Sequence, residues 1–126
     1  MAENNTPTPD KYTGPMTYDL SYTLVPMSGA EDWRHVTTMD GGEGYDWDEA
    51  RFYYSPSARR FFWARESGCS CNSWEDSVGL VSDFEDGDRG AALAAVRRIA
   101  ESMGDLPAAD AIDAADAIRT FKTKEN

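Results

Sequence analysis

The sequence is poor in the residue types and motifs that most often reveal an activity. It contains a single histidine, His35, and two cysteines in 126 residues. No neighbour in sequence marks His35 as a general base. A Gly-x-Ser-x-Gly elbow, a Walker loop and a dinucleotide-binding glycine pattern are all absent. We therefore expect a protein that is not an enzyme and that needs no cofactor.

Long apolar runs are also missing. No segment approaches the ~18 apolar residues that are needed to span a bilayer. Residues 1–10 lack the basic and apolar regions of a secretory signal. Two cysteines fit a reducing compartment and do not make a disulfide framework. These features predict a cytoplasmic protein without a membrane partner.

Basic residues are scarce relative to acidic ones. The chain has 12 Lys and Arg against 23 Asp and Glu, which gives a formal net charge of -11. A polyanion repels nucleic-acid phosphate, so direct binding of DNA or RNA is disfavoured. The same charge permits docking on a basic protein surface or mimicry of nucleic acid. It also fits a simpler interpretation, in which the charge serves only solubility.

The length of the chain fits one domain. Residues 1–15 contain three prolines and almost nothing to bury, which predicts a disordered arm. We expect a single domain over residues 16–122 and a disordered tail over residues 123–126.

Alternating apolar and polar residues predict the strands. Met16–Met27 alternates with period two, which is typical of a half-buried strand, and Arg34–Met39 is a candidate short strand. Tyr45–Tyr54 and Arg59–Glu66 form the clearest hairpin, with a turn at residues 55–58. Its aromatic residues fall on both parities, so both faces of the hairpin should be covered. A further short strand is possible near Val78–Val81.

The last third of the chain has helical periodicity. Asp88, or Asp86 as an alternative, is the expected N-cap of a first helix with apolar residues at spacings of four, three and four. A second helix starts near Pro107, with a buried stripe at Ile112, Ala115 and Ile118. The fold class expected is α+β, with a small antiparallel sheet of three or four strands and two C-terminal helices on one face. The expected core contains Tyr22, Leu24, Phe52, Tyr54, Phe61, Trp63, Val96 and Ile99.

Two acid-rich segments, residues 31–49 and 75–88, flank the hairpin. They suggest that acidic loops are presented to a basic partner. The run at residues 83–88 lacks the ligand spacing of a calcium loop, and helix capping is the favoured interpretation of it. The candidate binding residues are Asp46, Asp48, Glu75, Asp76, Asp83, Glu85 and Asp86.

The hairpin also carries arginines among its aromatic residues. Arg51, Arg60 and Trp63 are candidates for binding a nucleotide or another small molecule, because arginine can stack on a base or clamp a phosphate. The favoured alternative is that these arginines pair with the acidic loops and shield a strand edge.

Cys69 and Cys71 stand in a short Cys-Ser-Cys string after the hairpin. A zinc site would need four ligands. Besides the two cysteines, the distant His35 and either Glu75 or Asp76 would have to complete the set. A disulfide would close a very small ring and be labile and redox-active. The favoured interpretation is structural, with both thiols filling a tight pocket under a tryptophan.

The string Glu66-Ser67-Gly68-Cys69-Ser70-Cys71 is followed by Trp74-Glu75-Asp76 and preceded by Tyr45-Asp46-Trp47-Asp48. Over residues 44–96 this pattern resembles a group of small uncharacterised proteins of actinobacterial phages. Asn72 departs from that group, in which proline is usual. The resemblance implies a phage or prophage accessory protein in a bacterial host cytoplasm, of a class that often binds a host protein.

Overall fold

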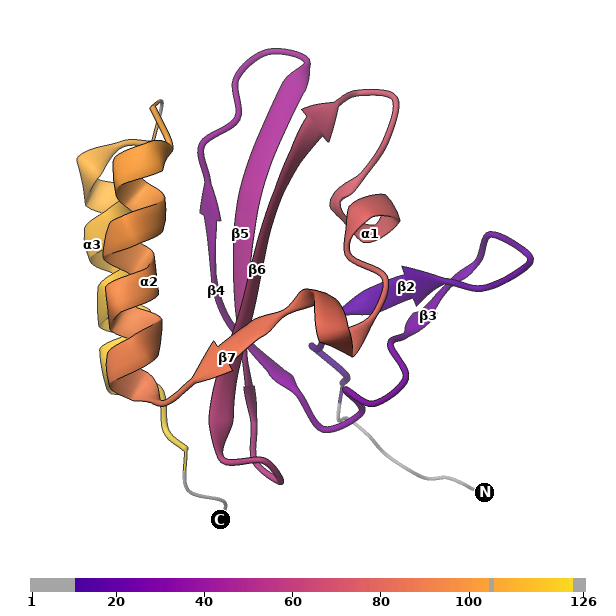
Figure 1. Ribbon diagram of the computed structural model, residues 1–126, viewed down its shortest axis with the longest axis horizontal. Coiled ribbons are helices and arrows are strands. Elements are labelled where there is room, and N and C mark those ends of the chain that lie inside the picture. Colours follow the sequence, from indigo (N-terminus) through magenta and orange to yellow (C-terminus); the bar gives the residue numbers. More distant parts are fainter. Residues whose placement is uncertain (1–10, 105, 124–126) are drawn as a thin grey trace.

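The computed structural model describes residues 11–104 and 106–123, and it shows an α+β arrangement with two antiparallel sheets (Figure 1). A four-stranded sheet has the order β4 (Arg34–Asp40), β5 (Asp46–Ser55), β6 (Arg60–Cys69) and β7 (Glu85–Gly87). A separate hairpin pairs β2 (Met16–Tyr18) with β3 (Leu24–Pro26). The helices are α1 (Trp74–Ser77), the 3-10 turn η1 (Val81–Asp83), α2 (Arg89–Ser102) and α3 (Ala108–Thr120).

The β5–β6 ribbon is the centre of the fold, as the sequence predicts. Its register runs without a break from Asp46 opposite Cys69 to Ser55 opposite Arg60. The chain reverses at residues 56–59, where the Arg59 N–H donates to the Ser55 carbonyl (2.8 Å). Arg59 has a left-handed backbone (φ 56°), which a tight turn imposes.

Both faces of this ribbon are buried, which confirms the expectation from its aromatic residues. Helices α2 and α3 cover one face, while α1 and the β2–β3 hairpin lie on the other side of the sheet (Figure 1). The helix side buries Phe52, Tyr54, Phe61, Trp63, Val96 and Ile99. The opposite side buries Trp33, Tyr53, Trp74, Val78 and Phe84. Each such side chain contributes roughly 1.5–3 kcal/mol of transfer free energy, so these two clusters hold the sheet in place.

The segment Met16–Met27 corrects the sequence prediction of one strand. The chain reverses within it because the Asp19 carboxylate accepts hydrogen bonds from the Ser21 and Thr23 N–H groups (2.8 and 3.0 Å). The reversal carries Tyr22 (86% exposed) and Leu24 (42% exposed) away from the core in which they were expected.

The predicted arm also needs correction at its C-terminal end. Pro15 is fully buried, and the Tyr12 hydroxyl donates to the Pro15 carbonyl (2.6 Å). Residues 11–15 therefore pack on the domain. Residues 1–10 and 124–126 of the predicted arm and tail lie outside the described residues.

The C-terminal helices follow the prediction with one exception. Asp88 is the N-cap of α2, and its carboxylate accepts from the Ala91 N–H (2.8 Å). In α3 the buried positions are Ala114 and Ile118, whereas Ile112 is 61% exposed. The buried stripe is therefore rotated away from Ile112. Residues 78–81 form no strand, and β7 supplies the fourth strand instead.

Candidate functional site

Most of the acids predicted to bind a partner are engaged inside the fold. Asp48 accepts two hydrogen bonds from the Arg65 guanidinium (2.8 and 2.7 Å). This pairing raises the pKa of Arg65, although the partial burial of the guanidinium opposes the shift. The Asp86 carboxylate forms an ion pair with Arg60. These contacts fasten the sheet, and they leave the Asp48 side chain 21% exposed and that of Asp86 42% exposed.

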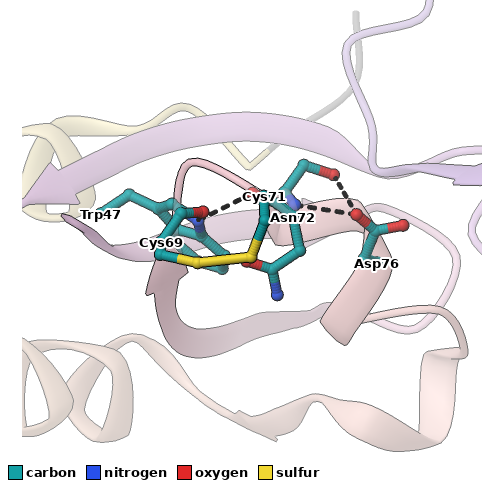
Figure 2. The surroundings of a disulfide bond; sticks show 6 residues. Trp47, Cys69, Cys71, Asn72 and Asp76 are labelled. Atoms are coloured by element: carbon teal, nitrogen blue, oxygen red, sulfur yellow. Dashed lines mark hydrogen bonds between the residues drawn. A yellow bond between two sulfur atoms is a disulfide. The ribbon is translucent and has the colours of Figure 1, made fainter. Parts of the chain in front are cut away.

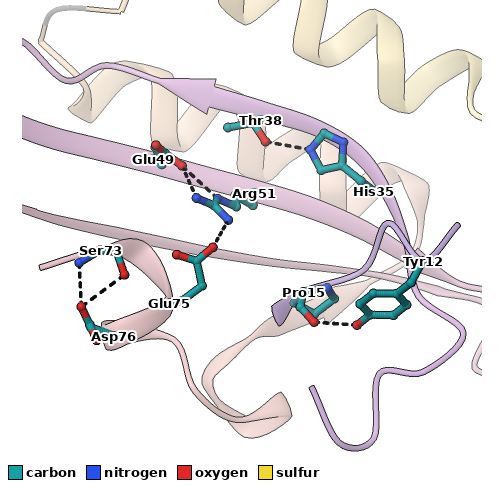
Figure 3. Close-up of polar contacts among 9 residues, drawn as sticks. All are labelled: Tyr12, Pro15, His35, Thr38, Glu49, Arg51, Ser73, Glu75 and Asp76. Carbon is teal, nitrogen blue, oxygen red and sulfur yellow. Dashed lines mark hydrogen bonds and ion pairs between the residues drawn. The ribbon is translucent and has the colours of Figure 1, made fainter. Parts of the chain in front are cut away.

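Asp76 and Asp83 serve as caps. The Asp76 carboxylate accepts from the backbone N–H of Ser73 (2.8 Å) at the start of α1 (Figure 3). The Asp83 carboxylate accepts from the N–H groups of Gly79 and Leu80 (3.0 Å each). Both carboxylates satisfy donors that the first turn of a helix leaves unpaired.

Arg51 holds α1 against the sheet. Its guanidinium binds Glu49 (2.8 Å) on its own strand and Glu75 (3.0 Å) on α1, as Figure 3 shows. It also lies 4.3 Å from the centre of the Trp74 ring. Burial opposes its charge, but the two carboxylates outweigh burial and raise the pKa of Arg51. Glu75 is thereby engaged as well.

Glu85 and Asp46 complete the predicted set. The Glu85 carboxylate accepts from the Trp63 indole N–H (3.2 Å) and from Arg98 (3.1 Å). Asp46 is the one predicted acid whose carboxylate has no hydrogen bond or ion pair with a described residue. Its backbone forms two hydrogen bonds with that of Glu43 (3.0 and 3.1 Å).

Three carboxylates without a partner among the described residues lie toward one end of the β5–β6 ribbon. We call Glu43, Asp46 and Glu66 the acidic ribbon end. Glu66 lies opposite Glu49 in the register, three residues along β5 from Asp46, or about 10 Å. Because successive residues of a strand face opposite sides, the Glu66 side chain projects from the α1 side of the ribbon and the Asp46 side chain from the helix side. This separation exceeds the Debye length of about 8 Å at physiological salt, so Glu66 acts as a charge apart from Glu43 and Asp46. The sequence analysis missed Glu43 and Glu66, because the predicted turn at residues 55–58 would place Glu66 opposite Trp47 and not opposite Glu49, another acid.

Beside this end, β6 has an open edge. β7 pairs only with Phe61–Trp63, so the rest of β6 has a strand on one side alone. Among the described residues, no group outside β5 and β7 hydrogen-bonds to the main chain of residues 64–68. In an antiparallel strand alternate residues direct their N–H and C=O groups to either side. The outer side of residues 64–68 therefore presents unpaired peptide groups.

A hollow of about 480 Å³ lies along this edge. Its lining comes from β6 (Trp63 to Glu66), from α2 (Arg98, Ile99 and Ser102) and from the acids Asp83 and Glu85. Its volume is within the range of ligand-binding clefts, roughly 300–1,000 Å³.

The ribbon, the open edge and the hollow all lie in the part of the chain that matches a known family. The family model described as a domain of unknown function (DUF7574) matches residues 31–123. The chain belongs to this family. No curated protein and no solved structure matches it. The β2–β3 hairpin precedes the matched residues.

The arginines and tryptophan proposed for nucleotide binding do not converge in this DUF7574 domain. Arg51 and Arg60 project from the face of the sheet that α1 covers, whereas Trp63 is buried on the helix side. Each of the two arginines is paired with a carboxylate. The geometry agrees with the alternative in which these arginines pair with the acidic loops.

The cysteine loop of the DUF7574 domain contains a disulfide between Cys69 and Cys71, both of which are exposed (Figure 2). The expectation of two thiols in a tight pocket is therefore wrong. The Trp47 indole N–H donates to the carbonyls of Cys69 and Asn72 (2.9 Å each), so this tryptophan fixes the loop from β5.

The metal interpretation finds no assembled ligand set. The described residues contain no group of three His, Cys, Asp or Glu side chains that could hold a metal ion. His35 lies on β4, which β5 separates from β6, and its ring nitrogen hydrogen-bonds to the Thr38 hydroxyl (2.7 Å). Burial and the nearby charge of Arg51 lower the pKa of His35. In the described part of the chain, no helix is both long and apolar enough to cross a membrane.

Proposed function

We propose that this protein is a non-enzymatic binding protein that engages a basic surface of a host protein through the acidic ribbon end. The observation that carries the proposal is the position of Glu43, Asp46 and Glu66 toward one end of the ribbon, where none of the three carboxylates has a partner among the described residues. The net charge of -11 adds long-range attraction for a basic partner and speeds their encounter.

The proposed setting is a bacterial cytoplasm, in which the protein acts as a phage accessory factor. The support for this setting is the resemblance of the string Ser67–Cys71 and its acidic neighbours to proteins of actinobacterial phages. The acids that form caps and ion pairs shape the docking surface by fixing the loops around it.

Affinity capture from an actinobacterial lysate tests the proposal. The variant Glu43→Gln/Asp46→Asn/Glu66→Gln removes three charges that hold no part of the fold, so its circular dichroism and thermal midpoint should match the wild type. We expect the wild type to retain a basic protein and the variant to lose it. Capture should also weaken as salt rises from about 0.05 to 0.5 M, because exposed charges are screened.

A matched control removes the same charge elsewhere. Glu101→Gln/Asp110→Asn/Asp113→Asn changes three exposed acids on α2 and α3 that have no side-chain partner among the described residues. We expect this variant to capture the partner as the wild type does. Equal capture by both triple variants would show that the acidic ribbon end is not the docking surface.

A further inference from the structure

The residue that precedes β7 does not extend the pairing along the open edge of β6. Phe84 precedes β7 and would lie opposite Ala64, but its N–H donates to the Val81 carbonyl of η1 (3.1 Å) and not to β6. Its ring packs edge-on against the rings of Trp33 and Trp74, and the distances between ring centroids are 5.1 and 5.9 Å. Phe84 ends the η1 turn, and this turn sets where β7 begins, so the edge beyond Trp63 stays free.

Exposed edges of this kind are templates for another strand, and proteins usually cover or protect them. The hollow beside residues 64–66 lies where β7 would continue. Ile99 and Ser102 of α2 form one of its walls, and the segment from Asp83 to Glu85 forms the other. An extended segment placed in this hollow would bond to the unpaired peptide groups of β6.

Charge selects the kind of segment that fits. Glu66 is exposed and is the acid of the lining that has no partner among the described residues, whereas Asp83 caps η1 and Glu85 pairs with Arg98. The two arginines of the hollow are already neutralised, Arg65 by Asp48 and Arg98 by Glu85. A second copy of the chain would bring another net charge of -11 to the same edge, which opposes self-pairing.

Resting on the proposed function, we propose that the partner presents an extended basic segment that adds to the sheet as a strand along residues 64–68 of β6. The segment residue opposite Glu66 is basic, because directly opposed side chains lie about 5 Å apart. Its neighbours, on the other face, point toward Ile99 and are apolar. The preferred sequence therefore alternates basic and apolar residues. Main-chain hydrogen bonds provide the affinity, and the side chains provide the specificity.

The test uses a capped six-residue peptide of alternating lysine and valine. Two further versions carry N-methyl groups on the odd or on the even residues, with the same charge. In an added strand only one of the two sets of N–H groups faces β6. We expect one methylated version to lose at least about tenfold in affinity, because several hydrogen bonds are removed, and the other to bind like the parent.

Backbone NMR of the labelled protein provides the second measurement. Peptide binding should slow hydrogen exchange at alternate amides within residues 64–68, and Glu66→Gln should weaken binding about threefold or more. Asp113→Asn, which removes a charge on α3, should leave the affinity unchanged.

Equal affinity of the two methylated versions would overturn strand addition, and so would the absence of binding at about 1 mM peptide. Protection of the same amides in a peptide-free dimer would also overturn it, because a second copy would then be the occupant. None of these results touches the proposed function, which depends on whether neutralising the acidic ribbon end abolishes capture of a basic protein.

Discussion

Replacing Arg51 by methionine should cost about 3 kcal/mol of unfolding free energy, since this side chain links three parts of the fold. Its guanidinium binds Glu49 and Glu75 and lies 4.3 Å from the centre of the Trp74 ring. Exposed ion pairs contribute about 0–1 kcal/mol, and removing one member of a buried pair costs about 3–5 kcal/mol. The side chains of Arg51, Glu49 and Glu75 are 22%, 24% and 16% exposed, so the pair lies between these limits. The cation–π contact adds about 0.5–1 kcal/mol.

Urea unfolding followed by tryptophan fluorescence and circular dichroism measures this loss, provided that the two transitions coincide. Arg51→Lys is the matched control. It keeps the charge and part of the stem but lacks the planar fork that reaches both carboxylates, so we expect a loss of roughly half that of Arg51→Met. Combining Arg51→Met with Glu75→Gln should be less than additive by about 1 kcal/mol, because both changes remove the same ion pair.

A different outcome would refute the reasoning. If Arg51→Met unfolds within about 0.5 kcal/mol of the wild type, Arg51 does not hold α1 on the sheet and its three contacts have no net stabilising effect. Full additivity with Glu75→Gln would show that the ion pair itself contributes nothing.

Three further changes test other parts of the structure. Cys69→Ser/Cys71→Ser opens a three-residue loop, and the chain-entropy relation predicts a loss of at most about 1.6 kcal/mol in the free energy of unfolding by denaturant. A larger loss would mean that the disulfide organises more than its own loop. Trp47→Phe keeps a ring but removes both indole hydrogen bonds, so the free energy of unfolding should fall by about 1–2 kcal/mol and exchange of the loop amides should quicken, whereas unchanged exchange would contradict this role. Partial burial alone would raise the pKa of Asp32, but hydrogen bonds from Ser57 and Ser55 outweigh it and lower that pKa. The stabilisation from Asp32 should therefore be present at pH values above about 3.9, the pKa of an aspartate in the unfolded chain, and should be lost as the pH falls through the lower pKa of the folded state. In thermal unfolding, Asp32→Asn should lose less stability on acidification than the wild type.

The ribbon and α2 could be predicted because their signals are local. The two arms of β5 and β6 are aromatic on both parities, and only a strand covered on both faces accommodates that pattern. Asp88 followed by apolar residues at helical spacing specifies where α2 begins and which side is buried. The capping roles of Asp76 and Asp83 could also be predicted in part, since an acid three residues after Ser73 has the spacing of a capping box.

Other features depend on contacts that periodicity does not report. Tyr18, Leu20, Tyr22 and Leu24 alternate as in a strand, yet the Asp19 carboxylate stabilises a reversal in the middle of the pattern. The rotation of α3 away from Ile112 depends on how its alanines fit against neighbouring elements. The free edge of β6 depends on where β7 starts, and this is set by the η1 turn, whose Val81 carbonyl accepts from the Phe84 N–H.

The charge of the chain and the open edge of β6 explain each other. An unpaired edge is usually protected from pairing with another copy by charged side chains, a proline or a bulge. Residues 64–68 contain no proline, and the register of β6 with β5 shows no bulge, so Arg65 and Glu66 are the protecting residues of this edge. The net charge of -11 adds to this protection, because two copies of the chain repel each other. In the proposed complex the same negative charge attracts a basic segment, so one property opposes self-association of the edge and favours a cationic partner.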